Sequence, residues 1–430
     1  MTPRKSLRYD TTKPQLDVYL YNQVVGHIGQ DGPDVWFKYT DSVQGADSRE
    51  HQISVRMPVR AEVYDHNATL AFFDNLLLES DTRTALAREV KQDQRDVAGL
   101  LGQVGGECAG AVAIWPHGTR PPDRPEYRSY SKTQLGILFD EAHGEHFTQA
   151  QLESRQSMSG VQDKLVFRKA DTSYDLPLNG APGDVILKRP SPRYQGLVEN
   201  EYVCQQLVTA IDLGAAKATA LTGSLYLLES RRYDRHASGA GEIRRLHQED
   251  FCQSLSRSPR AKYQRHQGPG FADISRAVRQ YSAQPLRDLD RLIRVAILNV
   301  CIGNMDAHAK NFSFLYADDG IQLAPFYDVV STIIYPTLDP SYSMYIGTAS
   351  RPAELSPHAL ERFARELQVS PSAVLSAIDE VVTGIEGAWP AVSSAAILET
   401  GHQPVYDLID RTIKSQSTIL RAAARKRLAI

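Results

Sequence analysis

The stretch 303–312 places an acid, a base and an amide in one short segment. Asp306 and Asn311 stand five residues apart, with His308 and Lys310 between them. In phosphoryl transfer, this spacing places a carboxylate beside the acceptor hydroxyl and an amide oxygen beside a divalent metal ion. A lysine in the same loop can neutralise charge on the transferring phosphoryl group. The segment therefore predicts a catalytic loop with Asp306 as general base.

Asp328 and Lys188 are candidates for the remaining polar groups of such a site. Asp328 follows a predicted strand and a turn at Pro325, where protein kinases hold a metal-binding aspartate, although Val-Val replaces the usual Phe-Gly after it. Lys188 ends a predicted strand, from which it can reach the α- and β-phosphates of ATP. Glu201 opens the next helix and could pair with Lys188, or could simply be an acid favoured by the helix dipole. This order of residues predicts an ATP site with Mg²⁺ bound by Asn311 and Asp328.

The phosphate-binding loop follows no common pattern. The chain contains neither G-x-G-x-x-G nor a Walker A motif. Instead, residues 157–164 form a small, hydroxyl-rich turn with one glycine before the predicted strand 165–167. Such a turn can present backbone N–H groups to phosphates as an anion-binding nest.

The surrounding elements follow from hydrophobic periodicity. Alternation between residues 16 and 39 predicts an antiparallel meander, and residues 71–78 begin a helical layer. A strand at 109–115 precedes a Pro- and Arg-rich linker at 116–125, and further strands are predicted at 165–167, 185–187 and 224–229. Helical spacing marks 200–213 and 289–302, and only helices are predicted after about residue 355. We predict a polar extension (1–14), an N-terminal subdomain (15–118), the rest of a β-rich N-lobe (119–230) and a mostly helical C-lobe (231–430).

Composition restricts the class of protein. The chain has 430 residues, and its 48 Lys and Arg against 51 Asp and Glu give a net charge of −3. The apolar fraction of 42% argues against global disorder, and the balanced charge argues against extensive nucleic-acid coating. No apolar run approaches the roughly 20 residues that cross a bilayer, so we expect no membrane partner. The start of the chain lacks a secretory pattern and the four cysteines form no C-x-x-C pair, so we expect a cytoplasmic protein.

Several motifs resemble those of the HipA family, the serine/threonine kinase toxins of bacterial type II toxin–antitoxin modules. The N-terminal part shares Phe-Phe-Asp-Asn-Leu-Leu at 72–77 and Gly-Ala-Val at 110–112. The remaining motifs are Ser-x-Ser-Gly-x-Gln-x-Lys at 157–164, Asn-Glu-Tyr at 200–202, Arg-Tyr-Asp-Arg at 232–235, Gln-Glu-Asp-Phe-Cys-Gln at 248–253, Asp-Ala-His-Ala-Lys-Asn-Phe-Ser at 306–313 and Pro-Phe-Tyr-Asp at 325–328.

The resemblance implies a fold and a role for each matching residue. It implies an α+β, two-lobed, protein-kinase-like fold, with a β-rich N-lobe, an all-helical C-lobe and ATP in the cleft between them. Ser157 matches the autophosphorylated serine, and the hinge that pairs with adenine is expected between Glu229 and Tyr233. The implied ATP-binding residues are Ser159, Gly160, Val161, Gln162, Asp163, Lys164, Lys188, Glu229, Ser230, Arg231, Tyr233, His308, Ala309, Lys310, Asn311, Tyr327 and Asp328.

The resemblance also implies partners: a small helix-turn-helix antitoxin like HipB, operator DNA bound mainly through that antitoxin, and a cellular protein substrate such as an aminoacyl-tRNA synthetase.

Two alternative functions stay open. A small-molecule kinase would share the Asp-x-x-x-x-Asn pattern and the later aspartate. A catalytically silent, DNA-binding co-repressor would keep the fold, but intact Lys188, Asp306, Asn311 and Asp328 argue against it. Asp306 and Asn311 alone could also form a capping turn.

Overall fold

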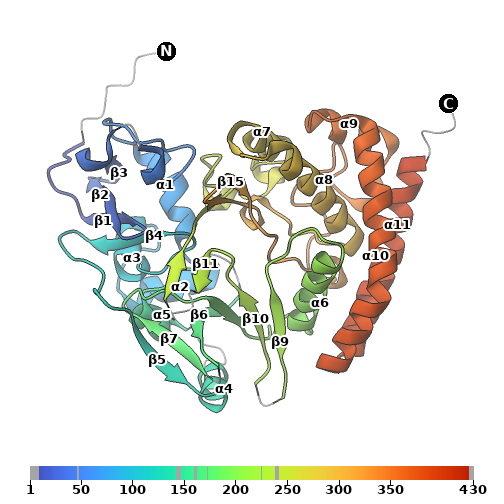
Figure 1. Cartoon of the computed structure of the whole chain (residues 1–430), viewed down its shortest axis with the longest axis horizontal. Helices are drawn as coiled ribbons and strands as arrows, with labels where there is room; N and C mark the ends of the chain where they lie inside the picture. The colour runs from blue at the N-terminus through green and yellow to red at the C-terminus, as the bar shows by residue number, and fades with distance from the viewer. Residues whose placement is uncertain are drawn as a thin grey trace.

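The computed structural model describes residues 9–45, 48–141, 147–158, 162–171, 173–223, 225–237 and 242–425. The N-terminal subdomain and the helices α10 and α11 lie at opposite ends of the long axis (Figure 1). A six-stranded sheet and a helical core lie between them.

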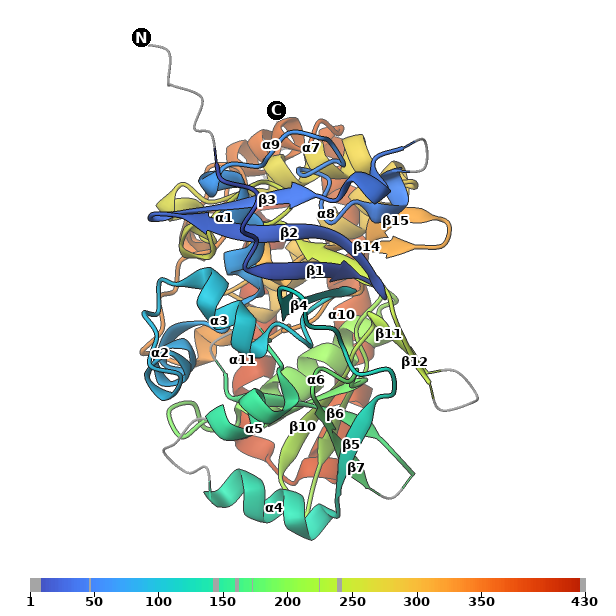
Figure 2. The same cartoon turned by 90° about the vertical axis from the view of Figure 1, so that its left-hand side faces the viewer.

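The N-terminal subdomain is a four-stranded antiparallel sheet in the order β3-β2-β1-β4 (Figure 2). Its strands are β1 (Leu16–Leu20), β2 (Gln23–Asp31), β3 (Asp34–Tyr39) and β4 (Val112–Pro116). The helices α1 (His66–Phe73), α2 (Ser80–Glu89) and α3 (Val97–Val104) belong to the same subdomain. Asp65 caps α1 by accepting from the Ala68 N–H, and Asp96 caps α3 by accepting from the Gly99 N–H.

The second sheet has six antiparallel strands in the order β5-β7-β6-β8-β10-β9. They are β5 (Glu126–Tyr130), β6 (Lys164–Lys169), β7 (Tyr174–Leu178), β8 (Val185–Lys188), β9 (Ala218–Leu221) and β10 (Leu227–Arg231). Side chains alternate between its two faces. Leu227 packs in a core with α4 (Lys132–Glu141) and the segment leading into α5 (Thr148–Ser154). The next residue, Leu228, packs in the larger core with α6 (Leu197–Ala210).

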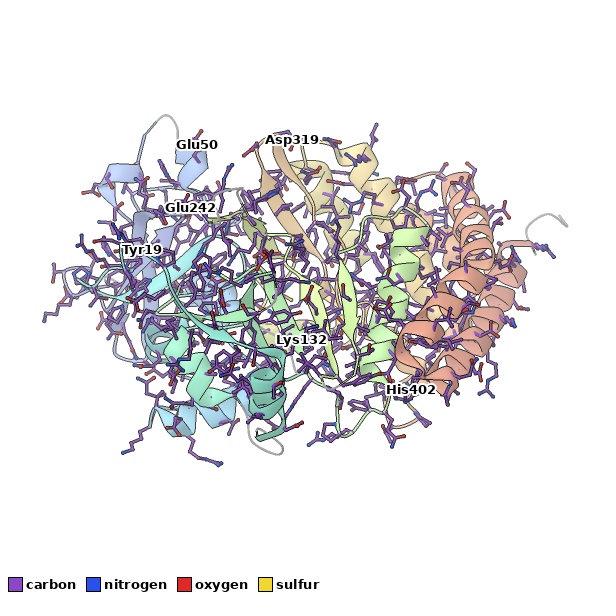
Figure 3. All side chains as sticks on the ribbon, turned by 60° about the horizontal axis from the view of Figure 1, so that its bottom comes forward. Tyr19, Glu50, Lys132, Glu242, Asp319 and His402 are labelled. Carbon is purple, nitrogen blue, oxygen red and sulfur yellow. The ribbon has the colours of Figure 1, made fainter. Side chains whose placement is uncertain are left out.

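The C-lobe is built around α8 (Pro285–Ile302), whose residues from Leu292 onward are nearly all buried. It packs against α7 (Phe271–Tyr281), α10 (Pro371–Thr400) and α11 (Gln403–Arg425), and α9 (Pro357–Glu366) joins the same core. His402, between α10 and α11, lies 3.5 Å through Nε2 from Glu199 Oε1 on α6 (Figure 3). This contact joins the terminal helices to the helix that carries Glu201.

The structure confirms an α+β, two-lobed fold but corrects the expectation of an all-helical C-lobe. This lobe contains the hairpin β11 (Arg235–Ala237) and β12 (Ile243–Arg245). It also contains a three-stranded sheet of β13 (His247–Asp250), β14 (Ser313–Ala317) and β15 (Gly320–Leu323). Strands this short give weak periodic patterns in a sequence, so the prediction missed them.

Helix α10 is apolar over much of its length. Within the described part of the chain it is one helix that is long and apolar enough to cross a membrane by length and composition, with 28% of its most apolar window buried. One face of α10 packs on the core through Val374, Ile378, Val381, Ile385 and Trp389.

Candidate active site

Lys188 lies between two carboxylates at the centre of the molecule. Its Nζ donates to Glu201 Oε1 on α6 at 2.6 Å and also forms an ion pair with Asp328. The side chains of Lys188 and Glu201 are 5% exposed, whereas that of Asp328 is 36% exposed. Glu201 is therefore a partner of Lys188 and not merely an acid that the helix dipole favours at this position.

The electrostatics of this triad are set by burial and by opposite charge. Burial raises the pKa of Glu201, and the Lys188 ammonium opposes the rise. Burial would lower the pKa of Lys188, but Asp328 and Glu201 more than offset it and raise that pKa above its ordinary value. Burial would raise the pKa of Asp328, but Lys188 and Lys164 hold it below its ordinary value. Lys188 is therefore charged and Asp328 is ionised at neutral pH.

Asp328 has an uncommon backbone conformation. Its φ of +53° lies in the left-handed region, which costs a residue with a side chain roughly 1–2 kcal/mol. The preceding turn is held because the Phe326 N–H donates to Gly214 O at 2.9 Å and Phe326 O accepts from the Ala216 N–H at 2.9 Å. Neighbouring structure thus maintains a strained conformation that brings the Asp328 carboxylate to Lys188.

The loop that carries Asp306 begins where α8 ends. Gly303, with φ +70°, caps the helix in the left-handed conformation. Asp306 is exposed, and its Oδ1 accepts from the Tyr263 hydroxyl at 3.0 Å. Asn311 Nδ2 donates to the backbone oxygen of Asp306 at 3.2 Å, so the two residues that the sequence paired are in contact. The Asp306 carboxylate is accessible to an acceptor hydroxyl.

Lys310 makes contacts that the sequence did not predict. Its buried Nζ donates to Asn75 O at 3.0 Å, Asn75 Oδ1 at 2.8 Å and Asp250 Oδ2 at 2.8 Å. An ammonium group has three donors, and these acceptors occupy them. Lys310 therefore anchors the loop to the N-terminal subdomain, and a contact between this lysine and a nucleotide phosphate stays a prediction.

His308 is part of this loop, and Tyr327 packs against it. Burial lowers the pKa of His308, so the imidazole is neutral at neutral pH. The Tyr327 hydroxyl donates to Lys310 O at 2.7 Å and lies 2.7 Å from Ser313 Oγ. Ala309 is buried next to Lys310. These contacts support the loop, and whether His308, Ala309 and Tyr327 also contact a nucleotide stays a prediction.

The predicted phosphate loop is described only in part, because Ser159, Gly160 and Val161 lie outside the described residues. Next to them, Gln162 Nε2 donates to Arg189 O at 3.0 Å, and Asp163 forms an ion pair with Arg189. Lys164 on β6 is the cross-strand partner of Lys188 on β8. Cross-strand partners share one face of a sheet, so both lysines lie on the face that meets Asp328.

The predicted hinge begins within a strand, and its contact with adenine stays a prediction. Glu229 lies within β10, paired with Leu187 and Thr219, and its carboxylate accepts from Lys169 Nζ at 2.8 Å and Tyr174 Oη at 2.5 Å. Its polar groups are therefore committed to the sheet. Ser230 and Arg231 are the last residues of β10. Tyr233 is packed beside Tyr327 at 5.7 Å between ring centroids.

Sequence reasoning recognised the Arg-Tyr-Asp-Arg motif at 232–235 but not what it does. Arg232 and Arg235 are buried against Glu107 of the N-terminal subdomain, at 2.5 and 2.8 Å. Asp234 Oδ2 accepts from Arg232 at 2.8 Å and from the Gly110 N–H at 2.7 Å. The motif is thus a buried ionic network that joins the subdomain to the C-lobe. The available signal was the closely spaced charges of both signs between residues 229 and 235.

Ser157 is fully buried beside this interface. Its hydroxyl donates to Leu76 O at 2.8 Å, and its N–H donates to Glu107 O at 2.8 Å. A kinase could reach Ser157 only after this segment leaves its place.

Two domain families match the chain. The HipA N-terminal domain matches residues 16–115, and the HipA-like C-terminal domain matches residues 156–389. The chain is 34% identical over 362 residues to "Putative kinase Y4mE" of Sinorhizobium fredii, covering 82% of this chain and 86% of that protein. It is 25% identical over 339 residues to the serine/threonine-protein kinase toxin HipA of Shewanella oneidensis, covering 74% of this chain and 76% of that protein.

Among solved structures, the chain is similar to the toxin–antitoxin complex of Shewanella oneidensis HipA, HipB and operator DNA. The TM-score is 0.81 at 21% identity, over 95% of this chain and 97% of that chain. Two lobes, joined by the ion pair between Lys188 and Asp328, define the class as a protein-kinase-like fold with an added N-terminal subdomain. Because both HipA domains match in order and the second spans more than half of its length, the chain belongs to the HipA family.

Proposed function

We propose that this chain is an ATP- and Mg²⁺-dependent serine/threonine protein kinase and the toxin of a type II toxin–antitoxin module. The observation that carries the proposal is the buried Lys188, bonded to Glu201 on one side and Asp328 on the other. Two carboxylates from separate elements hold one buried lysine, and an exposed Asp306 stands on the loop that Lys310 anchors. Protein kinases use this combination for phosphoryl transfer.

Asn311 and Asp328 are suited to hold the metal. Mg²⁺ prefers oxygen ligands, which an amide and a carboxylate supply. Asn311 uses Nδ2 to donate to Asp306 O, which leaves its Oδ1 to coordinate an ion. The bound metal would neutralise the phosphates of ATP. Its positive charge would also compensate the Asp328 carboxylate, so that Lys188 could turn from Asp328 toward the phosphates.

Asp306 would orient the acceptor hydroxyl and accept its proton. The Tyr263 hydroxyl fixes Oδ1 of this carboxylate at 3.0 Å and leaves Oδ2 to face the acceptor. Tyr263 and Asp306 are both close to the surface of the loop, which suits a hydroxyl that arrives on a protein segment. Positioning and charge neutralisation account for most of the catalysis expected here.

The partners follow from the family. We propose a small helix-turn-helix antitoxin like HipB, operator DNA bound mainly through it, and a cellular protein substrate such as an aminoacyl-tRNA synthetase. The net charge of −3 supports weak DNA binding by the chain alone. A cytoplasmic location and autophosphorylation of Ser157 belong to the same proposal.

The decisive experiment measures transfer of radiolabelled phosphate from ATP to a cell extract, to the chain itself and to a panel of small alcohols, with and without Mg²⁺. We expect labelled serine and threonine in protein. Asp306→Asn should lower the rate by roughly 10²–10⁴ while ATP affinity stays within a few-fold. Asp318→Asn, at an exposed loop, is the matched control. Labelling of small alcohols alone would favour a small-molecule kinase, and the absence of any transfer would favour the silent co-repressor.

A further inference from the structure

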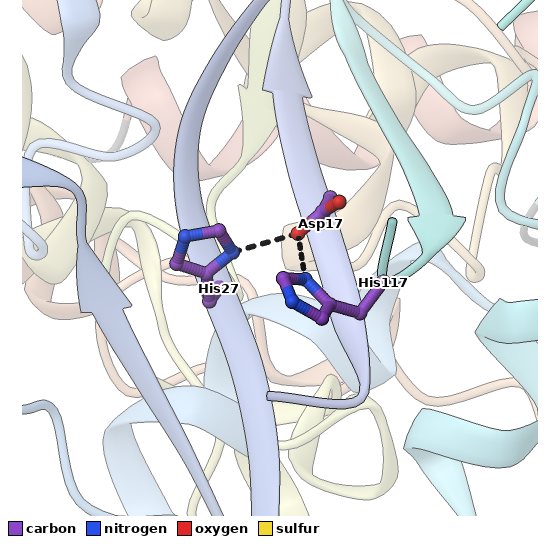
Figure 4. Close-up of side chains that lie close together, drawn as sticks. All are labelled: Asp17, His27 and His117. Carbon is purple, nitrogen blue, oxygen red and sulfur yellow. Dashed lines mark hydrogen bonds and ion pairs between the residues drawn. The ribbon is translucent and has the colours of Figure 1, made fainter. Parts of the chain in front are cut away.

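Asp17, His27 and His117 form a cluster on the N-terminal sheet (Figure 4). The Nδ1 atoms of both imidazoles lie 2.7 Å from the same oxygen, Oδ1 of Asp17. The remaining oxygen, Oδ2, accepts from the Gly118 N–H at 3.0 Å. One carboxylate oxygen is thus the meeting point of two imidazole nitrogens.

Strand pairing dictates this arrangement. Asp17 on β1 is the cross-strand partner of His27 on β2 and of Trp115 on β4. Partners share one face of a sheet, and His117 follows Trp115 by two residues, so all three side chains come to the same face. Gly118, at φ +78°, turns the chain back over the sheet so that its N–H reaches Asp17.

The three side chains of the cluster differ in how far they are exposed to solvent. The Asp17 side chain is 9% exposed, whereas those of His27 and His117 are 30% and 46% exposed. Burial would raise the pKa of Asp17, but hydrogen bonds from His117, Gly118 and His27 hold it below its ordinary value. An ionised, fixed oxygen therefore lies beneath two imidazoles that remain accessible from solvent.

At 2.7 Å, each contact is a hydrogen bond that an imidazole Nδ1–H donates to the Asp17 carboxylate. A metal ion can take the place of these two hydrogens once the three side chains move slightly apart. Two imidazoles and a carboxylate are a donor set suited to Zn²⁺, Co²⁺ or Ni²⁺, whereas Mg²⁺ prefers oxygen alone. The candidate ligand atoms all lie within 4.8 Å of one another, and ligands about 2.0–2.2 Å from a tetrahedral Zn²⁺ fit inside that span.

We propose that Asp17, His27 and His117 bind a first-row transition-metal dication such as Zn²⁺, with water at the open position. When the ion binds, each Nδ1 coordinates it through its lone pair and each neutral imidazole carries its one proton on Nε2, a shift of tautomer that occurs by proton exchange with solvent. Because His117 begins the segment that leaves β4 for β5, the bound metal ties this connection to the β1–β2 hairpin. Its role is therefore to stabilise the N-terminal subdomain, separately from the chemistry at Asn311 and Asp328.

One neighbouring charge opposes the binding of a cation. Lys38 on β3 is the cross-strand partner of His27, so its stem shares the face of the cluster. Repulsion between its ammonium and a dication should weaken the site, and Lys38→Gln should bind the metal more tightly than the wild type.

The test uses the full-length, untagged chain after removal of metals. Titration with Co²⁺ should give a visible absorption spectrum that saturates at one ion per chain and that Zn²⁺, but not Mg²⁺, abolishes. Zn²⁺ should also raise the melting temperature. His27→Gln and His117→Gln should each weaken Co²⁺ binding by at least about tenfold, the scale on which loss of a supporting contact acts. His236→Gln, an exposed histidine on β11, should bind as the wild type does.

Two results would overturn the proposal: no saturable Co²⁺ binding by the wild type, or an unchanged spectrum in both His27→Gln and His117→Gln. In the first case, the cluster is a hydrogen-bonded group held by protons. If the variants do not fold, anomalous scattering at the zinc edge from wild-type crystals soaked in Zn²⁺ decides the matter. A peak between Asp17, His27 and His117 supports the site, and its absence there excludes it.

Discussion

Lys310 Nζ lies 2.8 Å from Asn75 Oδ1, so the loop that carries Asp306 is bonded to the N-terminal subdomain. Asn75 itself is buried, and its Nδ2 donates to Ala71 O and to Arg257 O, both at 2.8 Å. The subdomain is therefore part of the support of the catalytic loop, and changes in it should reach the active site.

Replacing Asn75 with alanine tests this coupling. The change leaves the buried Lys310 ammonium with fewer acceptors, which costs roughly 1–3 kcal/mol of unfolding free energy. We expect Asn75→Ala to lower the urea midpoint and the kinase rate together, whereas Asn67→Ala, at an exposed position of α1, should change neither. Full activity in Asn75→Ala would show that the loop keeps its position without this contact.

The metal-binding role proposed for Asp328 predicts a selective loss of Mg²⁺-dependent ATP binding. Asp328→Asn removes the charge that compensates Lys188 and that would bind Mg²⁺. The Mg²⁺-dependent part of ATP affinity should fall by at least the roughly 10- to 100-fold that a lost supporting contact costs. Isothermal titration with ATP at several Mg²⁺ concentrations measures it, with Asp318→Asn as control. An identical response to Mg²⁺ in Asp328→Asn and the wild type would contradict the role.

The buried carboxyl of Glu249 should make the free energy of unfolding depend on pH. Its buried carboxyl contacts the Ser54 hydroxyl at 2.6 Å and the Tyr316 hydroxyl at 2.6 Å, and burial raises its pKa from 4.5 to about 7. Between these two values the folded protein keeps a proton that the unfolded chain has lost, so this contribution to stability falls as pH rises from 4.5 to about 7. Each unit of pKa difference corresponds to about 1.4 kcal/mol.

Glu249→Gln should therefore lose stability less steeply with pH than the wild type. The glutamine amide mimics the protonated carboxyl, since Nε2 can donate to Ser54 while Oε1 accepts from the Val55 N–H, now 2.9 Å from Glu249 Oε1. Urea unfolding at pH 5, 6, 7 and 8 measures the effect. Glu242→Gln, at an exposed position, should follow the wild type. Equal slopes for wild type and Glu249→Gln would exclude this residue as the source.

Autophosphorylation of Ser157 requires that its segment leave the interface with Leu76 and Glu107. A phosphate adds about −1.5 to −2 charges at neutral pH, which a fully buried site cannot accommodate. Wild type incubated with Mg²⁺ and ATP should gain one phosphate on Ser157 by mass spectrometry, bind ATP poorly afterward and become sensitive to protease near residue 157. Asp306→Asn should gain none. Modification of both proteins would indicate another kinase in the preparation.

Hydrophobic periodicity and local chemistry were enough to predict many of the secondary-structure elements and the candidate site residues. The spacing of apolar residues predicted α8, because a helix buries residues three and four positions apart, and Gly303 marked its end. The order of Lys188, Glu201, Asp306, Asn311 and Asp328 could be read because each residue lies at or near the end of a locally encoded element. How closely these residues approach one another in space depends on the fold.

Only the tertiary structure decided which charges meet. Lys310 and Asn75 are 235 positions apart, and Ser54 and Glu249 are 195 apart. No local pattern records such pairs, because a buried lysine or glutamate has the same neighbours in sequence whether it contacts a ligand or another part of the chain. For that reason the sequence suggested Lys310 as a phosphate ligand and passed over Asp17, His27 and His117. Strand register, which the sequence determines only through the packed sheet, brings these three side chains to one point.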